Sequence, residues 1–198
     1  MLLTVWRLCG TRPGPLAYNP MEYFDVLNER GEKTGKVKLR SDVHRDGDWH
    51  AAVHIWILNS EGELLMQRRS PIKDTGANMW DISYGGHVQA GNTSFGEAFR
   101  EGKEELGLDL LDKDLELIFT VTQNGKNEAQ TNREFNDVYL VRKDLDSEAL
   151  VLQEEEVAEV RFMPWQDVRQ RIEEHNPEFC QHPDEYVALF EYLDRDQH

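Results

Sequence analysis

Four glutamates and one arginine between positions 97 and 105 are the residues whose types and spacing best suit chemistry in this sequence. Glu97, Glu101, Glu104 and Glu105 recur at helical intervals, and Arg100 lies among them. Each pair of like charges at such a spacing costs a helix roughly 0.2–0.5 kcal/mol. A divalent cation would relieve this repulsion, because Mg2+ binds carboxylate oxygens and water. The plain alternative is an acidic helix face in contact with solvent.

Glycines on both sides of the acidic segment favour a binding site over a solvated face. Gly85 and Gly86 follow the β-prone run 80–84, and Gly91 comes just before the acidic segment. Glycine allows sharp turns and a close approach of the backbone to a ligand. We therefore expect a strand, a glycine loop and then the acidic helix.

The limits of this helix are also predicted by residue type. Ser94 and Glu97 have the spacing of a capping box, and Gly107 is a typical stop signal. Between them, small and apolar residues recur at helical spacing and are expected to face the core. This expected stripe consists of Phe95, Ala98, Phe99, Gly102 and Leu106.

The strand, glycine loop and acidic helix together resemble the signature of the Nudix hydrolase superfamily, G-x5-E-x7-R-E-U-x-E-E-x-G-U, where U is aliphatic. The matching positions are Gly86, Arg100, Glu101, Glu104, Glu105, Gly107 and Leu108. Two positions differ, since Asn92 replaces the first glutamate and Gly102 replaces an aliphatic residue. Asn92 keeps hydrogen-bonding capacity but loses a charge, so metal affinity is expected to fall. Gly102 should cost the helix about 1 kcal/mol relative to alanine, but it lets another segment pack closer.

This resemblance implies a fold and a reaction. The fold would be an α/β Nudix fold, a mixed β-sheet sandwiched between α-helices, and the reaction would be substitution at phosphorus by a metal-activated water. Glu101, Glu104 and Glu105 would hold Mg2+ (or Mn2+), and Arg100 would orient these carboxylates through an ion pair. The general base would be Glu104 or Glu105. Outside candidates for the base are Glu134 and the run 154–156.

A wider resemblance covers most of the chain. Segments 23–70 and 79–92 are similar to the Nudix branch that includes type I isopentenyl-diphosphate isomerases. In those isomerases, a cysteine before the signature works with a glutamate to move protons at an allylic carbon. Gly85 stands in the place of that cysteine, and glycine cannot transfer a proton. Isomerase activity is therefore not expected.

The isomerase resemblance also implies a second metal site. Its ligands correspond to His50, His87 and Glu134. A further carboxylate position falls on Asn136 or Asp137, and His44 lies one residue away from another ligand position. Imidazoles with a carboxylate suit Mn2+ or Zn2+. The alternative is that these histidines only form hydrogen bonds within the fold.

Substrate contacts are expected at the glycine loop and at the end of a hairpin. Gly86 would bring the backbone close to the substrate, and Arg68 and Arg69 are candidates for binding phosphate. For the two arginines, solvated charge at a strand end is the alternative.

Composition limits the classes of protein that fit. The 198 residues, 39% of them hydrophobic and 30% charged, suit one soluble globular domain, expected over residues 21–198 after an N-terminal extension 1–20. The formal net charge of -16 disfavours nucleic acid and anionic membranes as partners. Cys9 and Cys180 are isolated in sequence, which fits a reducing cytoplasm. Monomer and homodimer both stay open.

The remaining elements are expected from periodicity. Strands are expected at 23–27, 36–39, 51–58, 63–68, 117–122, 137–141 and 157–163, with 51–68 as a hairpin, and helices at 164–173 and 183–193.

The sequence thus predicts a metal-dependent hydrolase acting on a diphosphate linkage, in a nucleoside diphosphate derivative or a related organic diphosphate. The partner would be that small molecule. Two alternatives are an isomerase-type enzyme and a Nudix-like binding module that has lost catalysis, the latter suggested by Asn92 and Gly102.

Overall fold

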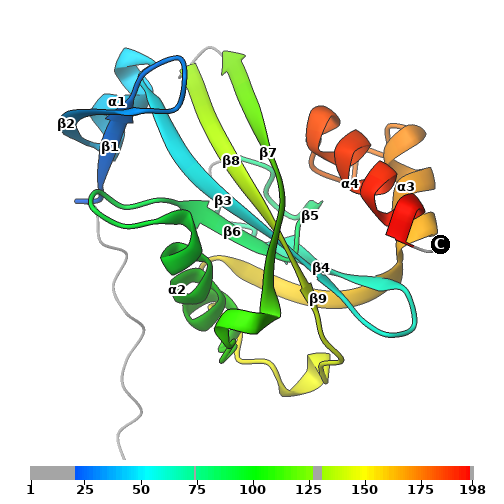
Figure 1. Ribbon diagram of the computed structural model, residues 1–198. Helices are drawn as coiled ribbons and strands as arrows, with labels where there is room; N and C mark the ends of the chain where they lie inside the picture. Colours follow the sequence, from blue (N-terminus) through cyan, green and yellow to red (C-terminus); the bar gives the residue numbers. More distant parts are fainter. Residues whose placement is uncertain (1–20, 74, 127–130, 197–198) are drawn as a thin grey trace, which may run out of the picture.

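The computed structural model describes residues 21–73, 75–126 and 131–196, and the expected extension 1–20 lies outside these ranges (Figure 1). Within them, nine strands form one mixed sheet and four α-helices surround it. The strands are β1 (Tyr23–Leu27), β2 (Lys33–Leu39), β3 (Trp49–Leu58), β4 (Glu63–Arg69), β5 (Trp80–Asp81), β6 (Tyr84–His87), β7 (Leu115–Lys126), β8 (Thr131–Arg142) and β9 (Val157–Pro164). The helices are α1 (Arg40–Asp46), α2 (Ser94–Leu106), α3 (Trp165–Glu173) and α4 (Pro183–Asp196), with short 3-10 turns at Asp112–Asp114 and Ser147–Ala149. No helix in these ranges is long and apolar enough to cross a membrane.

Strand β3 is the centre of the sheet and joins segments that are distant in sequence. It pairs antiparallel with β1, β4 and β6, and parallel with β8. The expected β3–β4 hairpin is confirmed only near its turn, at Leu58 opposite Leu64. Farther along, β6 takes the place beside β3, from Ile55 opposite Tyr84 to Ala52 opposite His87. This exchange brings Gly85 and Gly86 to the middle of the sheet. Both were expected in a loop, but they lie within strand β6 and pair with β3, so the connection to α2 begins only after His87.

Alternate side chains of β3 enter two separate cores, because successive residues of a strand point to opposite faces. Trp56 and Leu58 belong to the core that α3 and α4 cover. Val53, Ile55 and Ile57 belong to the core under α2. Figure 1 shows α2 and the pair α3–α4 on different sides of the sheet. The expected sheet between helices is therefore present.

Helix α2 begins at Ser94 and ends before Gly107, as predicted, but its cap differs from the prediction. Gly107 follows it with a φ of 67°, the left-handed conformation that glycine adopts readily. The N-cap is Thr93 rather than Ser94, and the Thr93 side chain accepts a hydrogen bond from the Gly96 amide. The Ser94 hydroxyl instead donates to Asp137 on β8. The expected capping box between Ser94 and Glu97 is wrong, because Glu97 turns inward.

The inner face of α2 is more acidic than periodicity predicts. Glu97 and Glu105 are buried with Ala98, Gly102 and Leu106, while Phe95 is 37% exposed. Periodicity assigned the large apolar side chain to the core and the carboxylates to the other side. A solvated acidic face is therefore excluded for Glu97 and Glu105.

Candidate active site

A cavity of about 560 Å³ lies beside helix α2 and strand β6, which contributes Gly85, Gly86 and His87 to its lining. Its volume falls within the range of small-molecule sites in proteins. The carboxylates that line it are Glu22, Asp81, Glu101, Glu104, Glu105, Glu134 and Glu156. The cations that line it are Arg40, Arg69, Lys73 and Arg100. The site is therefore polar throughout, as a binding site for a charged ligand and cations should be.

Arg100 is the centre of an ion-pair network on α2. Its Nη1 lies 2.7 Å from Oε2 of Glu104, and its Nη2 pairs with Oε1 of Glu101. Its Nε donates to Oε2 of the fully buried Glu97 at 2.5 Å. One guanidinium thus fixes three carboxylates of the same helix, which agrees with the orienting role expected for Arg100.

Glu101 lies directly against Gly86 of strand β6. A Cβ atom at Gly86 would lie 2.1 Å from Oε1 of Glu101, so only glycine leaves room for this carboxylate. The pKa of Glu101 is raised to about 7. Burial is the main cause, Arg100 opposes the rise, and the nearby Glu104 and Glu97 carboxylates add to it. The structure therefore gives Gly86 a definite role in the placement of Glu101.

Glu105 is the carboxylate that most clearly lacks a partner. It is 5% exposed and lines the cavity, and its Oε2 has no hydrogen-bond partner among the described residues. Burial and the neighbouring Glu101 raise its pKa well above the usual value. A buried carboxylate oxygen without a donor is costly, and a cation would relieve that cost. The donor set of Glu101, Glu104 and Glu105 therefore fits Mg2+ or Mn2+.

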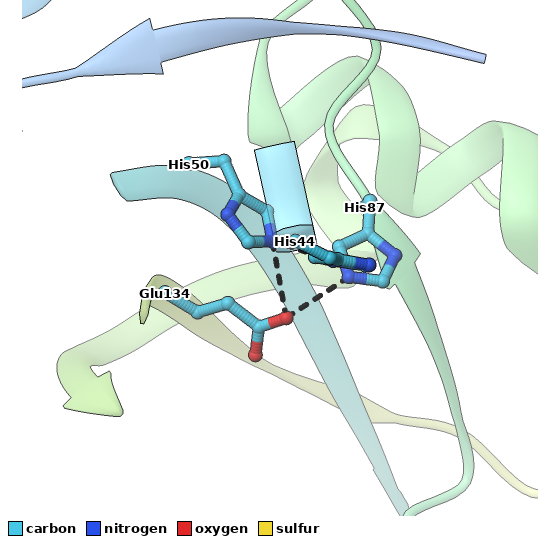
Figure 2. Close-up of side chains that lie close together, drawn as sticks. All are labelled: His44, His50, His87 and Glu134. Atoms are coloured by element: carbon cyan, nitrogen blue, oxygen red, sulfur yellow. Dashed lines mark hydrogen bonds and ion pairs between the residues drawn. The ribbon is translucent and has the colours of Figure 1, made fainter. Parts of the chain in front are cut away.

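A second cluster of side chains is assembled by strand register (Figure 2). His50 on β3 lies opposite Glu134 on the parallel strand β8, and His87 lies at the end of β6. Oε1 of Glu134 is 2.9 Å from Nε2 of His87 and 3.3 Å from Nε2 of His50. His44 on α1 joins them, with Nε2 3.3 Å from Nε2 of His50. The structure thus brings His44, the weaker candidate, into the group.

The electrostatics of this cluster suit a metal ion. Burial lowers the pKa of His44 to about 4, and burial also lowers the pKa of His87. Burial opposes ionisation of Glu134, but hydrogen bonds with His50 and His87 hold its pKa well below the usual value. One potential ligand atom from each of the four residues lies within 4.8 Å of the others. Neutral imidazoles beside an ionised carboxylate are the forms that bind transition metals.

The further carboxylate position is now resolved between two faces of β8. Asn136 lies on the same face as Glu134, is buried, and has an Oδ1 without a partner among the described residues. Asp137 points the other way and accepts hydrogen bonds from Ser94 and Thr120. The position beside Glu134 therefore holds an amide instead of a carboxylate.

Comparison with known proteins now decides the family. A family model described as the NUDIX domain matches residues 48–182. The chain belongs to the Nudix family. Nudix hydrolase 3 of Arabidopsis thaliana is 44% identical over 182 residues, which are 87% of this chain and 23% of that protein. The chain thus spans less than a quarter of that relative.

Solved structures and isomerases agree with this placement. The crystal structure of DR0079 from Deinococcus radiodurans matches with a TM-score of 0.66 at 26% identity, covering 84% of this chain and 97% of that one. An isopentenyl-diphosphate Delta-isomerase of Shigella flexneri is 32% identical over 89 residues, 45% of this chain and 49% of that protein. The Nudix fold is therefore confirmed, and the isomerases are more distant relatives.

Gly85, the position that corresponds to the isomerase cysteine, leaves no room for a side chain in this Nudix chain. A Cβ atom at Gly85 would lie 2.6 Å from the carbonyl oxygen of Val53 and 2.8 Å from Cδ1 of Ile82. A backbone oxygen in a paired strand cannot yield easily. Beyond lacking the thiol, this position has no space for a cysteine side chain.

The two candidate arginines are placed differently. Arg69 lines the cavity, where its Nη1 lies 3.0 Å from Oδ2 of Asp81. The Arg68 guanidinium lies 6.0 Å from the centre of the Trp80 ring, and the cavity lining does not include Arg68. The structure supports the solvated strand-end alternative for Arg68 and keeps Arg69 as a candidate for phosphate binding.

Sequence reasoning missed other cavity residues. Lys73 pairs with Glu156, and His182 pairs with Asp81 at 2.8 Å. All four line the cavity, and only Glu156 among them had been named from sequence, within the run 154–156 of outside candidates for the base. Lys73 lies four residues after Arg69, and this nearness in sequence to a candidate for phosphate binding was the available signal. His182 gave no local signal, because it reaches the cavity only through the docking of α4.

Proposed function

We propose that this Nudix protein is a metal-dependent hydrolase that cleaves the diphosphate linkage of a nucleoside diphosphate derivative or a related organic diphosphate. The observation that carries the proposal is the unpartnered, buried oxygen of Glu105 on a cavity wall that also holds Glu101 and Glu104. The cavity has the size of a small-molecule site. The net charge of -16 makes local neutralisation of a diphosphate necessary.

Each part of the site then has a task. Glu101, Glu104 and Glu105 would hold Mg2+ (or Mn2+), and the bound ion would neutralise phosphate charge and acidify a water. Arg100 keeps Glu101 and Glu104 in place through its ion pairs. Arg69 and Lys73 present positive charge to the phosphates from the cavity wall.

Glu105 is the better of the two proposed general bases. Its pKa is raised by burial and by the neighbouring Glu101, which makes it a stronger base than an ordinary carboxylate. Glu104 is 37% exposed at its side chain and is already paired with Arg100. In the proposed reaction, Glu105 accepts a proton from the attacking water while the water oxygen forms a bond to one phosphorus. The bond from that phosphorus to the bridging oxygen breaks, the second phosphate leaves with this oxygen, and Glu104 keeps its ion pair with Arg100.

The histidine cluster is proposed as a second cation site. His44, His50, His87 and Glu134 would hold Mn2+ or Zn2+. The alternative is that these side chains only form hydrogen bonds with one another. In that case wild type and His87→Ala should have the same metal content. Metal analysis of wild type and His87→Ala separates the two.

The function is tested by incubating purified protein with Mg2+ or Mn2+ and a panel of possible substrates. The panel contains nucleoside di- and triphosphates, dinucleotides, sugar nucleotides and isopentenyl diphosphate. We expect phosphate-containing products from at least one compound, and Glu105→Gln should lower kcat by about 10²-fold or more. Glu104→Gln should lower it less, and Glu191→Gln on the exposed face of α4 is the matched control.

The possible results separate the three functions. No product from any compound would favour a binding module, and an unchanged rate in Glu105→Gln would contradict the mechanism. Dimethylallyl diphosphate formed from isopentenyl diphosphate would reveal an isomerase, which the closed position of Gly85 argues against.

A further inference from the structure

Glu97 is the most completely enclosed carboxylate of α2, with no solvent exposure at all. Both of its oxygens are occupied. Oε1 accepts hydrogen bonds from Nδ2 of Asn92 at 2.6 Å and from the backbone amide of Gln89 at 3.2 Å. Oε2 accepts from Nε of Arg100. Such complete pairing offsets the cost of burying a charged carboxylate.

These contacts make Glu97 a bridge between two parts of the site. On one side it accepts hydrogen bonds from Gln89 and Asn92 in the connection between β6 and α2. On the other side it pairs with the Arg100 guanidinium. Arg100 in turn pairs with Glu101 and Glu104. A change at Glu97 therefore reaches the cavity carboxylates through one intermediate side chain.

The same contacts explain Asn92, where the signature has a glutamate. The Asn92 amide is a donor to Glu97. A glutamate at position 92 would place a second carboxylate against Glu97. The two carboxylates would then have only two hydrogen-bond donors between them, Arg100 and the backbone amide of Gln89. A carboxylate at 92 and a carboxylate at 97 are therefore alternatives, and this chain has the second.

We propose that Glu97 is a positioning residue that supplies, from inside α2, the carboxylate that the signature places at position 92. It holds the connection between β6 and α2 together with Arg100, and through Arg100 it sets Glu101 and Glu104 for a divalent cation. This inference rests on the proposed metal-dependent function. It also means that Asn92 does not weaken the cation site, contrary to the expectation from sequence.

The test measures Mn2+ affinity directly by titration calorimetry and by the electron paramagnetic resonance signal of free Mn2+. Every protein compared, the reference included, carries His87→Ala, so that the proposed histidine site does not contribute. Glu97→Gln keeps the size of the side chain but turns an amide donor toward Arg100 or the loop. We expect Glu97→Gln and Glu97→Ala to weaken Mn2+ binding about 10-fold or more, the usual effect of losing an outer-shell partner. Asp109→Ala, which removes an exposed ion pair with Lys103 just beyond the same helix, should change nothing.

Moving the carboxylate is the decisive step. Asn92→Glu alone should weaken Mn2+ binding, because it adds a charge beside Glu97. The double variant Asn92→Glu/Glu97→Ala should recover Mn2+ affinity to within about 3-fold of the reference, since Arg100 regains one buried carboxylate partner. A residue that only stabilised the helix would show no such recovery, so thermal unfolding is measured alongside.

The outcomes separate this inference from the proposed function. If the reference binds no Mn2+, both the metal-dependent function and the role of Glu97 fail. If the reference binds Mn2+ and folded Glu97→Gln binds it equally well, or if the folded double variant stays as weak as Glu97→Ala, the function survives and the role of Glu97 is wrong. Should Glu97→Ala not fold, Glu97→Gln compared with the double variant gives the answer.

Discussion

At the level of single residues, the α2 carboxylates carry a cost in the metal-free protein that the proposed cation would relieve. Glu101 is mostly buried and its pKa is raised to about 7, above the ordinary 4.5. A carboxyl group with a raised pKa favours the folded state when it is protonated. Its favourable contribution is therefore present below about pH 4.5 and is lost as the pH rises to 7.

Glu101→Gln should consequently stabilise the metal-free protein at high pH. In EDTA, we expect the free energy of unfolding of the variant to exceed that of wild type by about 2 kcal/mol at pH 8, with a much smaller difference near pH 5. Urea unfolding at the two pH values measures this, with Glu191→Gln as the control. A difference that does not change between pH 5 and pH 8 would contradict the role assigned to the Glu101 charge.

Residue spacing predicted part of this site and missed the rest for a physical reason. Arg100, Glu101 and Glu105 were identified, because the signature fixes both their type and their interval. The inward direction of Glu97 was not, because helical spacing defines a face but not which edge of that face is buried. Glu97, Glu101 and Glu105 follow one another every four residues toward the sheet, whereas Glu104 lies toward solvent.

At the level of elements, the helices α2, α3 and α4 follow from periodicity, but the long strands do so only in part and the partners of β3 do not. The expected strand 137–141 misses the first half of β8 (Thr131–Arg142), which carries Glu134. Pairing of His50 with Glu134 depends on a parallel register between strands far apart in sequence. Helix α1, which carries His44, was not predicted, since it has seven residues and no side-chain cap at its start. Such a short helix is stable only through tertiary packing. The second cluster was thus proposed from resemblance and could not have been derived from local pattern.

The second departure from the signature, Gly102, is explained by contact between α2 and β6. A Cβ atom at Gly102 would lie 2.9 Å from the hydroxyl oxygen and 3.0 Å from Cζ of Tyr84. Tyr84 is fully buried, and its hydroxyl has no partner among the described residues. The tyrosine ring therefore occupies the space that an aliphatic side chain would fill from the helix.

This contact predicts that alanine at position 102 is unfavourable despite its better helix propensity. Gly102→Ala should lower the free energy of unfolding by about 1–2 kcal/mol, because the overpacking cost exceeds the gain of about 1 kcal/mol in propensity. Tyr84→Phe removes the nearest atom, so the same alanine should cost less in that background. The measurement is a double-mutant cycle by urea unfolding. Equal costs in both backgrounds would show that Tyr84 is not the obstacle.

For the molecule as a whole, part of the negative charge lines the cavity to which the proposed function assigns cations. The formal net charge is -16, and six glutamates line one cavity between the sheet and α2. Four arginine and lysine side chains line the same cavity, and ion pairs already engage Arg100, Arg69 and Lys73 there. Repulsion among the remaining charges opposes the compact state in the absence of divalent ions.

Divalent cations should therefore stabilise the whole fold more than ionic strength alone does. A ligand at 100 times its Kd adds about 2.7 kcal/mol to the free energy of unfolding. Each added kcal/mol raises the Tm of a protein of this size by about 2–4 °C. We expect Mg2+ or Mn2+ to raise the Tm of the EDTA-treated protein well above its value in NaCl of matched ionic strength. Glu101→Gln and Glu105→Gln should lose most of this gain while Glu191→Gln keeps it, as followed by calorimetry. If NaCl reproduced the shift, screening of the general negative charge would account for it, and the carboxylates of α2 would have no specific affinity for divalent ions.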